Sequence, residues 1–71
     1  LDGGSNGLEI IYKVIIKAKK LLKNKGYLFI EIGNGQSNMV TSILIKKGFR
    51  IVKKFLDYSK TIRCIMSTKE I

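Results

Sequence analysis

The sequence contains no histidine, proline or tryptophan and only one cysteine, Cys64. One cysteine cannot form an internal disulfide, and without histidine it cannot complete the four-ligand set of a structural zinc site. The lack of an imidazole also excludes catalysis by Ser-His or Cys-His pairs within the chain. We therefore expect neither a metal site nor a complete enzyme of that kind. We expect Cys64 to be a small core residue because its neighbours are apolar: Ile62, Ile65 and Met66.

Long apolar runs are also missing, because charges interrupt every stretch before the roughly 18 to 20 residues that a membrane span needs. Together with the single cysteine, this predicts a cytoplasmic chain without a membrane partner. The 71 residues allow one small domain at most, and a core of that size supplies only a few kcal/mol of net stability. The first residue is Leu1 instead of methionine, so we expect residues 1–71 to be part of a longer protein.

Positive charge is what the sequence has in excess: fourteen lysines and arginines against five acidic residues, a formal net charge of +9. A basic surface is typical of nucleic-acid binding through counterion release. A lysine-rich composition is also a common background feature. The three tyrosines and three phenylalanines lie in apolar stretches and do not alternate with the lysines, so nucleic acid is a possible partner but not the one we favour.

The hydrophobic periodicity predicts the order helix, strand, helix, strand, strand after a Gly-rich lead-in loop at 1–7. The first helix is expected over 7–24, with an Asn6–Glu9 capping box at its start and Gly26 as a left-handed residue after its end. The second helix is expected over 36–47, ending at Gly48. Strands are expected at 27–32, 49–56 and 61–67, the last two forming an antiparallel hairpin.

The strand at 27–32 is almost continuously apolar, which is typical of a strand buried on both faces in a parallel sheet. Right-handed crossovers would put both helices on the same face of that sheet. Nothing in the chain would then cover the opposite face, which indicates a partner or a missing half of the domain. On the second strand, Phe49, Ile51 and Phe55 are expected to share one face, with Val52 and Leu56 on the other.

One short motif resembles a ligand-binding turn, namely Glu31-Ile32-Gly33-Asn34-Gly35 between a strand and a helix. An acidic residue followed by Gly-x-Gly at the end of a parallel strand is how nucleotide and S-adenosylmethionine folds make room for a ligand. Asp57 stands about twenty residues further on, where a ribose-binding acid is expected. The third glycine is missing, so we favour a structural turn for Glu31, Gly33 and Gly35, and a hairpin turn for Asp57, with ligand binding as the alternative.

Two further groups of residues have a candidate role. Asp57 and Arg63 flank the predicted hairpin and are expected to pair across it. Asp2, Gly3 and Gly4 form either a functional loop or a flexible terminus.

The order of several segments resembles the carboxyl-terminal part of the release factor glutamine methyltransferases, the HemK/PrmC family. The resemblance covers essentially all 71 residues and rests on a Gly-rich lead-in, a strand-to-helix turn and the start of the next strand. These segments are Asp2-Gly3-Gly4-Ser5-Asn6-Gly7-Leu8, Glu31-Ile32-Gly33-Asn34-Gly35-Gln36 and Gly48-Phe49, followed by Leu56-Asp57 and Arg63.

The resemblance implies the carboxyl-terminal portion of an α/β, Rossmann-like class I methyltransferase fold. In that family, a methyl group passes from S-adenosylmethionine to the glutamine amide of the Gly-Gly-Gln motif in peptide chain release factors. The family's cofactor loop and catalytic Asn-Pro-Pro-Tyr loop are not in this sequence, so no catalytic or cofactor role transfers to any residue. Asp2, Gly3 and Gly4 are implied to border the substrate, and the amino-terminal part of the domain is the implied partner.

Three hypotheses follow. The first is an inactive fragment of that methyltransferase, with no cofactor bound by the fragment itself. The second is a stand-alone basic α/β module that binds RNA or a ribosomal partner. The third is a half-Rossmann unit that holds a nucleotide at Gly33–Gly35.

Overall fold

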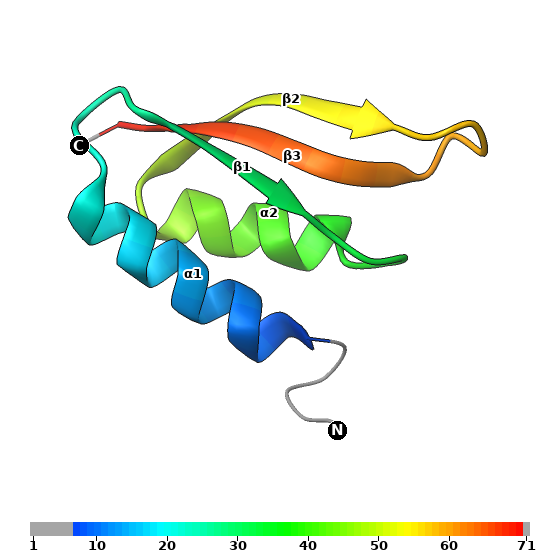
Figure 1. Ribbon diagram of the computed structural model, residues 1–71, viewed down its shortest axis with the longest axis horizontal. Coiled ribbons are helices and arrows are strands. Elements are labelled where there is room, and N and C mark those ends of the chain that lie inside the picture. The colour runs from blue at the N-terminus through cyan, green and yellow to red at the C-terminus, as the bar shows by residue number, and fades with distance from the viewer. Residues whose placement is uncertain (1–6, 71) are drawn as a thin grey trace.

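The structure is a computed structural model that describes residues 7–70 (Figure 1). Its elements follow the predicted order and start or end within three residues of the predicted bounds. They are α1 (Leu8–Leu21), β1 (Tyr27–Glu31), α2 (Ser37–Lys46), β2 (Phe49–Leu56) and β3 (Ile62–Lys69). The chain is therefore a small α/β unit, and none of its described helices is long and apolar enough to cross a bilayer.

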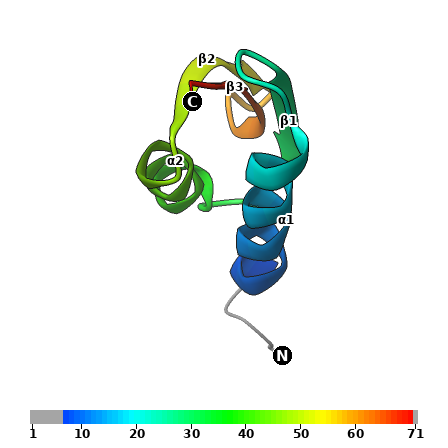
Figure 2. The same cartoon turned by 90° about the vertical axis from the view of Figure 1, so that its left-hand side faces the viewer.

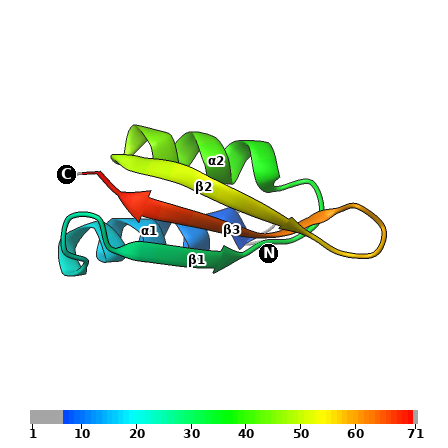
Figure 3. The ribbon, with the colours of Figure 1, turned by 90° about the horizontal axis from the view of Figure 1, so that it is seen from above.

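The three strands form one sheet in the order β1-β3-β2, as Figure 3 shows from the strand side. The predicted hairpin of β2 and β3 is confirmed. Because β3 also pairs antiparallel with β1, it separates the two strands that run in the same direction. The expectation that β1 has a parallel neighbour is therefore wrong for the described residues.

Both helices cover the same face of the sheet, with α1 beneath β1 and α2 beneath β2 (Figure 2). This arrangement was expected from the handedness of crossovers. The core between the layers consists of seven buried apolar residues: Ile15, Ile30, Ile32, Val40, Leu44, Phe49 and Ile65. Burying these side chains is the main favourable contribution to folding.

The other face of the sheet is uncovered among the described residues. Tyr27 and Phe29 of β1 keep 56% and 58% of their surface exposed, whereas Ile30 between the layers keeps 6%. The expectation that β1 is buried on both faces is therefore wrong for the described part of the chain. The apolar sequence of β1 is typical of a strand with cover on both sides, and the described residues supply cover on only one.

The ends of α1 differ from the predicted caps. Gly7, predicted as the first helical residue, is the N-cap residue, with φ of 77° and no side-chain capping bond. Asn6, the expected cap, lies outside the described residues. The left-handed residue after the helix is Lys25, with φ of 70°, and not Gly26. Gly26 instead lies close to the preceding turn, where a Cβ would be 3.0 Å from the carbonyl oxygen of Lys23, a tight contact.

Lys69 of β3 joins the end of α1 to the sheet. Its Nζ donates hydrogen bonds to the carbonyl oxygens of Lys19 and Leu22, the latter at 2.8 Å. The last carbonyls of a helix have no partner within the helix and carry partial negative charge, so a lysine is a favourable partner for them. Lys69 therefore fixes α1 against the sheet at the end where β3 finishes.

A β-bulge in β2 changes which side chains face outward. The register shifts between Ile51 and Lys53, so Val52 is an extra residue in the ladder. The shift reverses the alternation of side chains, and Phe55 comes to lie opposite Cys64 on the uncovered face. The expectation that Phe49, Ile51 and Phe55 share one face is therefore wrong.

Candidate functional site

The turn from β1 to α2 is closed by the side chain of Gln36. The Oε1 of Gln36 accepts a hydrogen bond from the main-chain N–H of Gly33 at 2.7 Å. The main-chain N–H of Gln36 donates to the carbonyl oxygen of Gly33 at 3.2 Å. Gln36 is only 6% exposed. Gly35 adopts φ of 77°, a conformation that glycine adopts without strain. The N–H of Gly33 therefore already has an acceptor within the turn.

Gln36 is the residue whose role the sequence analysis missed. The signal was present, because a glutamine three residues after a glycine can bond back to that main-chain N–H much as a capping side chain does. A Cβ on Gly33 would lie 3.4 Å from the Oε1 of Gln36, so the glycine leaves room for this close approach.

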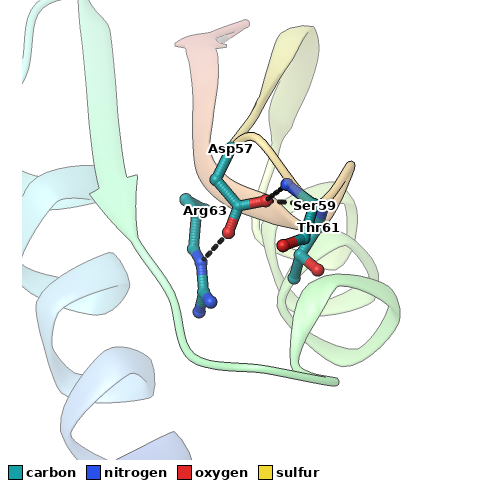
Figure 4. Close-up of polar contacts among 4 residues, drawn as sticks. All are labelled: Asp57, Ser59, Thr61 and Arg63. Atoms are coloured by element: carbon teal, nitrogen blue, oxygen red, sulfur yellow. Dashed lines mark hydrogen bonds and ion pairs between the residues drawn. The ribbon is translucent and has the colours of Figure 1, made fainter.

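Asp57 organises the β2–β3 turn, as Figure 4 shows. Its Oδ1 accepts from the N–H groups of Ser59 at 2.8 Å and Thr61 at 3.0 Å, and its Oδ2 accepts from the Nε of Arg63 at 2.8 Å. The expected pair between Asp57 and Arg63 is thus confirmed. The pKa of the Asp57 carboxyl lies below its ordinary value. The hydrogen bond from the N–H of Thr61 contributes most to this lowering, and the hydrogen bond from Arg63 contributes next. Both carboxylate oxygens are engaged within the hairpin.

Arg63 also connects the hairpin to the end of β1. Its carbonyl oxygen accepts from the N–H of Ile32 at 2.9 Å while its side chain holds Asp57. The two predicted candidate turns therefore lie at the same end of the sheet. The bonds at Gly33 and Asp57 favour the structural role for both turns, and the ligand-binding alternative stays a prediction.

The remaining predicted residues divide into two sets. Asp2, Gly3 and Gly4 lie outside the described residues, so their place beside a substrate stays a prediction. Within residues 7–70 no three His, Cys, Asp or Glu side chains come together in a way that could hold a metal ion. Cys64 is a free, half-buried cysteine on the uncovered side of the sheet, and not a fully buried core residue.

The uncovered face of the sheet gathers side chains from all three strands, and we call it the open face. Cross-strand pairing arranges these side chains in three rows. The rows are Tyr27–Thr68–Arg50, Phe29–Met66–Lys53 and Glu31–Cys64–Phe55. The rings of Phe29 and Phe55 lie with their centroids 6.5 Å apart. Aromatic and cationic side chains, which are separate along the sequence, therefore meet on this face.

A second basic surface runs along α1. A hollow of about 300 Å³ is lined by Tyr12, Lys13, Ile16, Lys17 and Lys20. The Nζ of Lys47 lies 5.3 Å from the centroid of the Tyr12 ring. This surface has lysines around one aromatic ring, whereas the open face presents three aromatic rings.

Comparison with known proteins shows what the chain is similar to. It is 36% identical over 69 residues to the release factor glutamine methyltransferase of Thermodesulfovibrio yellowstonii, an alignment that covers 97% of this chain and 25% of that protein. The proteins of the same name from Clostridium acetobutylicum and Aquifex aeolicus are 30% and 33% identical, each over 97% of this chain and 24% of their own length. Over nearly its whole length, the chain is similar to part of the release factor glutamine methyltransferases. No family model and no solved structure matches it.

The chain spans about a quarter of the length of these methyltransferases. The resemblance seen in the sequence is therefore confirmed, and it extends across nearly the whole chain. Within the described residues, Gln36 accepts from the Gly33 N–H, and the hairpin engages both oxygens of the Asp57 carboxylate.

Proposed function

We propose that this chain is the carboxyl-terminal part of a release factor glutamine methyltransferase domain. The whole protein would methylate the glutamine amide of the Gly-Gly-Gln motif in a peptide chain release factor, using S-adenosylmethionine, in the cytoplasm. The observation that carries the proposal is the 36% identity across 97% of the chain. In this proposal residues 1–71 are a partial domain, and the cofactor and catalytic residues lie in the rest of the protein.

The free edge of β1 supports a sheet that continues beyond these residues. β1 has β3 on one side and no described strand on the other. Its sequence, Tyr-Leu-Phe-Ile-Glu, carries a charge only at its last residue. Unprotected edges of this kind pair readily with other strands, and native proteins usually block them with charges, proline or a bulge. The edge of β1 therefore has the properties of a strand from the interior of a larger sheet.

The handedness of crossovers indicates where a strand preceding α1 would lie. The β1–α2–β2 crossover and α1 lie on the same face of the sheet (Figure 2). If a preceding parallel strand leads into α1, a right-handed connection with its helix on this face places that strand at the free edge of β1. The sheet order would then be the new strand, β1, β3 and β2, with the next part of the domain beside β1.

The contribution of this chain to catalysis is then structural. Methyl transfer to an amide depends on holding the reacting groups in line, and these residues would supply a rigid layer against which that site is built. We predict no methyl transfer by the 71-residue chain alone.

A chimera tests the proposal. The matched quarter of the Thermodesulfovibrio yellowstonii protein is replaced by this chain, and methylation of a release factor is measured by mass spectrometry. Methylation at the Gly-Gly-Gln glutamine is the expected result. A matched control carries Leu44→Asp, which places a charge at a fully buried position and should abolish folding and activity together. A folded chimera that methylates nothing would contradict the proposal, as would methyl transfer by the isolated chain.

A further inference from the structure

The turn between β2 and β3 projects beyond the rest of the described fold. Figures 1 and 3 both show it extending past the end of β1 and past the two helices. We call residues 56–61 the hairpin tip. It lies at the end of the sheet where β1 and β2 finish, and α1 begins at that same end (Figure 1). Ligands of open α/β sheets bind outside the carboxyl ends of the parallel strands. The hairpin tip therefore projects at the end where the whole domain would receive its substrate.

The hairpin tip carries side chains that the turn itself does not require. Tyr58 is fully exposed and Leu56 is 55% exposed. Together with Asp57 they line a hollow of about 280 Å³. Tyrosine and lysine are not among the residues that favour turns, and Lys60 adopts φ of 66°, a left-handed conformation that glycine or asparagine adopts with less strain. The geometry of the turn therefore does not explain the choice of Tyr58 and Lys60.

Hydrogen bonds hold the hairpin tip in one conformation. The main-chain N–H of Asp57 donates to the carbonyl oxygen of Thr61 at 2.9 Å, and that of Lys60 donates to the carbonyl oxygen of Asp57 at 3.0 Å. The Asp57 carboxylate accepts from the N–H groups of Ser59 and Thr61. A tyrosine has only two side-chain angles to fix, so a ring carried by a rigid turn loses little conformational entropy on binding. Tyr58 thus has the properties of a preorganised anchor for a protein partner.

The position of the hairpin tip keeps it accessible in a larger domain. The strand that we place next to β1 would extend the sheet sideways, on the side opposite to β3. A layer over the open face would stack on the sheet. The hairpin tip instead lies beyond the ends of the strands, along their direction (Figure 3). Neither addition therefore needs to cover Tyr58.

We propose that the hairpin tip binds the release factor itself, with Tyr58 and Leu56 packed against an apolar side chain of the factor and Lys60 beside an acidic one. This inference rests on the proposed function and adds a contact outside the pocket that takes the glutamine. A small-molecule site encloses most of its ligand, whereas a ring at the end of a projection meets the surface of a macromolecule. The Asp57 carboxylate is engaged by the hairpin, so the hollow beside it suits an apolar group.

Steady-state kinetics of the chimera described above, which is a full-length methyltransferase, test this inference. Tyr58→Ala should raise the KM for the release factor about tenfold, the loss expected of an interface anchor. The kcat and the KM for S-adenosylmethionine should stay within about twofold, because the hairpin tip does not touch the reacting groups. Tyr58→Phe keeps the ring and should retain most of the affinity for the release factor.

Matched controls separate the hairpin tip from exposed side chains in general. Ser59→Ala changes the same turn but keeps the N–H that bonds to Asp57, and Tyr12→Ala removes an exposed ring on α1. Both should leave the three kinetic constants unchanged. Lys60→Asn removes the charge and relieves the left-handed strain, so it should raise the KM for the release factor about threefold without lowering the melting temperature. Tyr58→Ala should also leave the melting temperature unchanged, because the ring is fully exposed.

The outcomes distinguish this inference from the proposed function. An unchanged chimera that methylates no release factor contradicts the proposed function, and the role of the hairpin tip falls with it. If the unchanged chimera is active and Tyr58→Ala does not raise the KM for the release factor, only the role of the hairpin tip is overturned. It is also overturned if Tyr12→Ala raises that KM as much as Tyr58→Ala does. A lower melting temperature of Tyr58→Ala would mean that the ring packs inside the whole protein, which likewise excludes a contact with the release factor.

Discussion

Replacing Gln36 by methionine tests whether the turn after β1 is a closed structural element. Methionine keeps the length of the side chain and its packing but removes the oxygen that accepts from the N–H of Gly33 at 2.7 Å. The substitution leaves that N–H without its acceptor in a partly buried position. The cost of such a loss is about 1 to 2 kcal/mol of unfolding free energy.

This loss is large for a chain of 71 residues, whose total stability is expected to be only a few kcal/mol. With a urea dependence of about 1 kcal/mol per molar, the midpoint of unfolding should fall by about 1 to 2 M. Circular dichroism in urea at neutral pH measures it, and amide hydrogen exchange should show faster exchange at Gly33.

Asn34→Ala provides the matched control for Gln36→Met. Asn34 lies in the same turn but is exposed, so its replacement should change stability by less than about 0.5 kcal/mol. If Gln36→Met is as harmless as Asn34→Ala, the hydrogen bond to Gly33 does not close the turn. The reasoning that favours a structural role over a ligand site would then fail.

Two further predictions concern the hairpin and the edge of β1. The pKa of the Asp57 carboxyl is lower in the folded than in the unfolded chain. The stability that the ionised carboxylate contributes is therefore complete above about pH 4 and is lost as the pH falls further. Urea midpoints at neutral pH and at about pH 3 should therefore differ less for Asp57→Asn than for the unchanged chain, and equal differences would contradict this role. The main-chain N–H groups of successive residues in β1 point alternately toward β3 and toward the free edge, and that of Phe29 points to the free edge. The amide of Phe29 should therefore exchange quickly in this chain and slowly in the whole protein. The amide of Ile30, which faces β3, should be protected in both, and fast exchange of Phe29 in the whole protein would exclude a strand at this edge.

The order of elements was predictable because each depends on local sequence. The helical period of α1, the apolar run of β1 and the turn residues before β3 each point to one conformation. The pair between Asp57 and Arg63 was predictable for the same reason, since both residues flank one hairpin. The match to the family was predictable from motifs distributed across the whole sequence.

The departures come from contacts that the sequence pattern does not encode. The bulge at Val52 inserts one residue, which is enough to move Phe55 to the opposite face of the sheet. The left-handed residue is Lys25, while the N–H of Gly26 donates a hydrogen bond to the carbonyl oxygen of Lys23 at 2.9 Å. Gln36 closes its turn through a side-chain hydrogen bond that leaves no trace in hydrophobic periodicity.

The bulge also explains why the mixture of aromatic rings and cations on the open face was not foreseen. Along the sequence, Phe29 lies in an apolar run and Phe55 follows two lysines, so the aromatic residues do not alternate with cations. In the folded chain the register of β3 places Phe29 in the same row as Lys53, and the bulge adds Phe55 beside them. These aromatic and cationic side chains therefore lie side by side in space although they do not alternate in sequence.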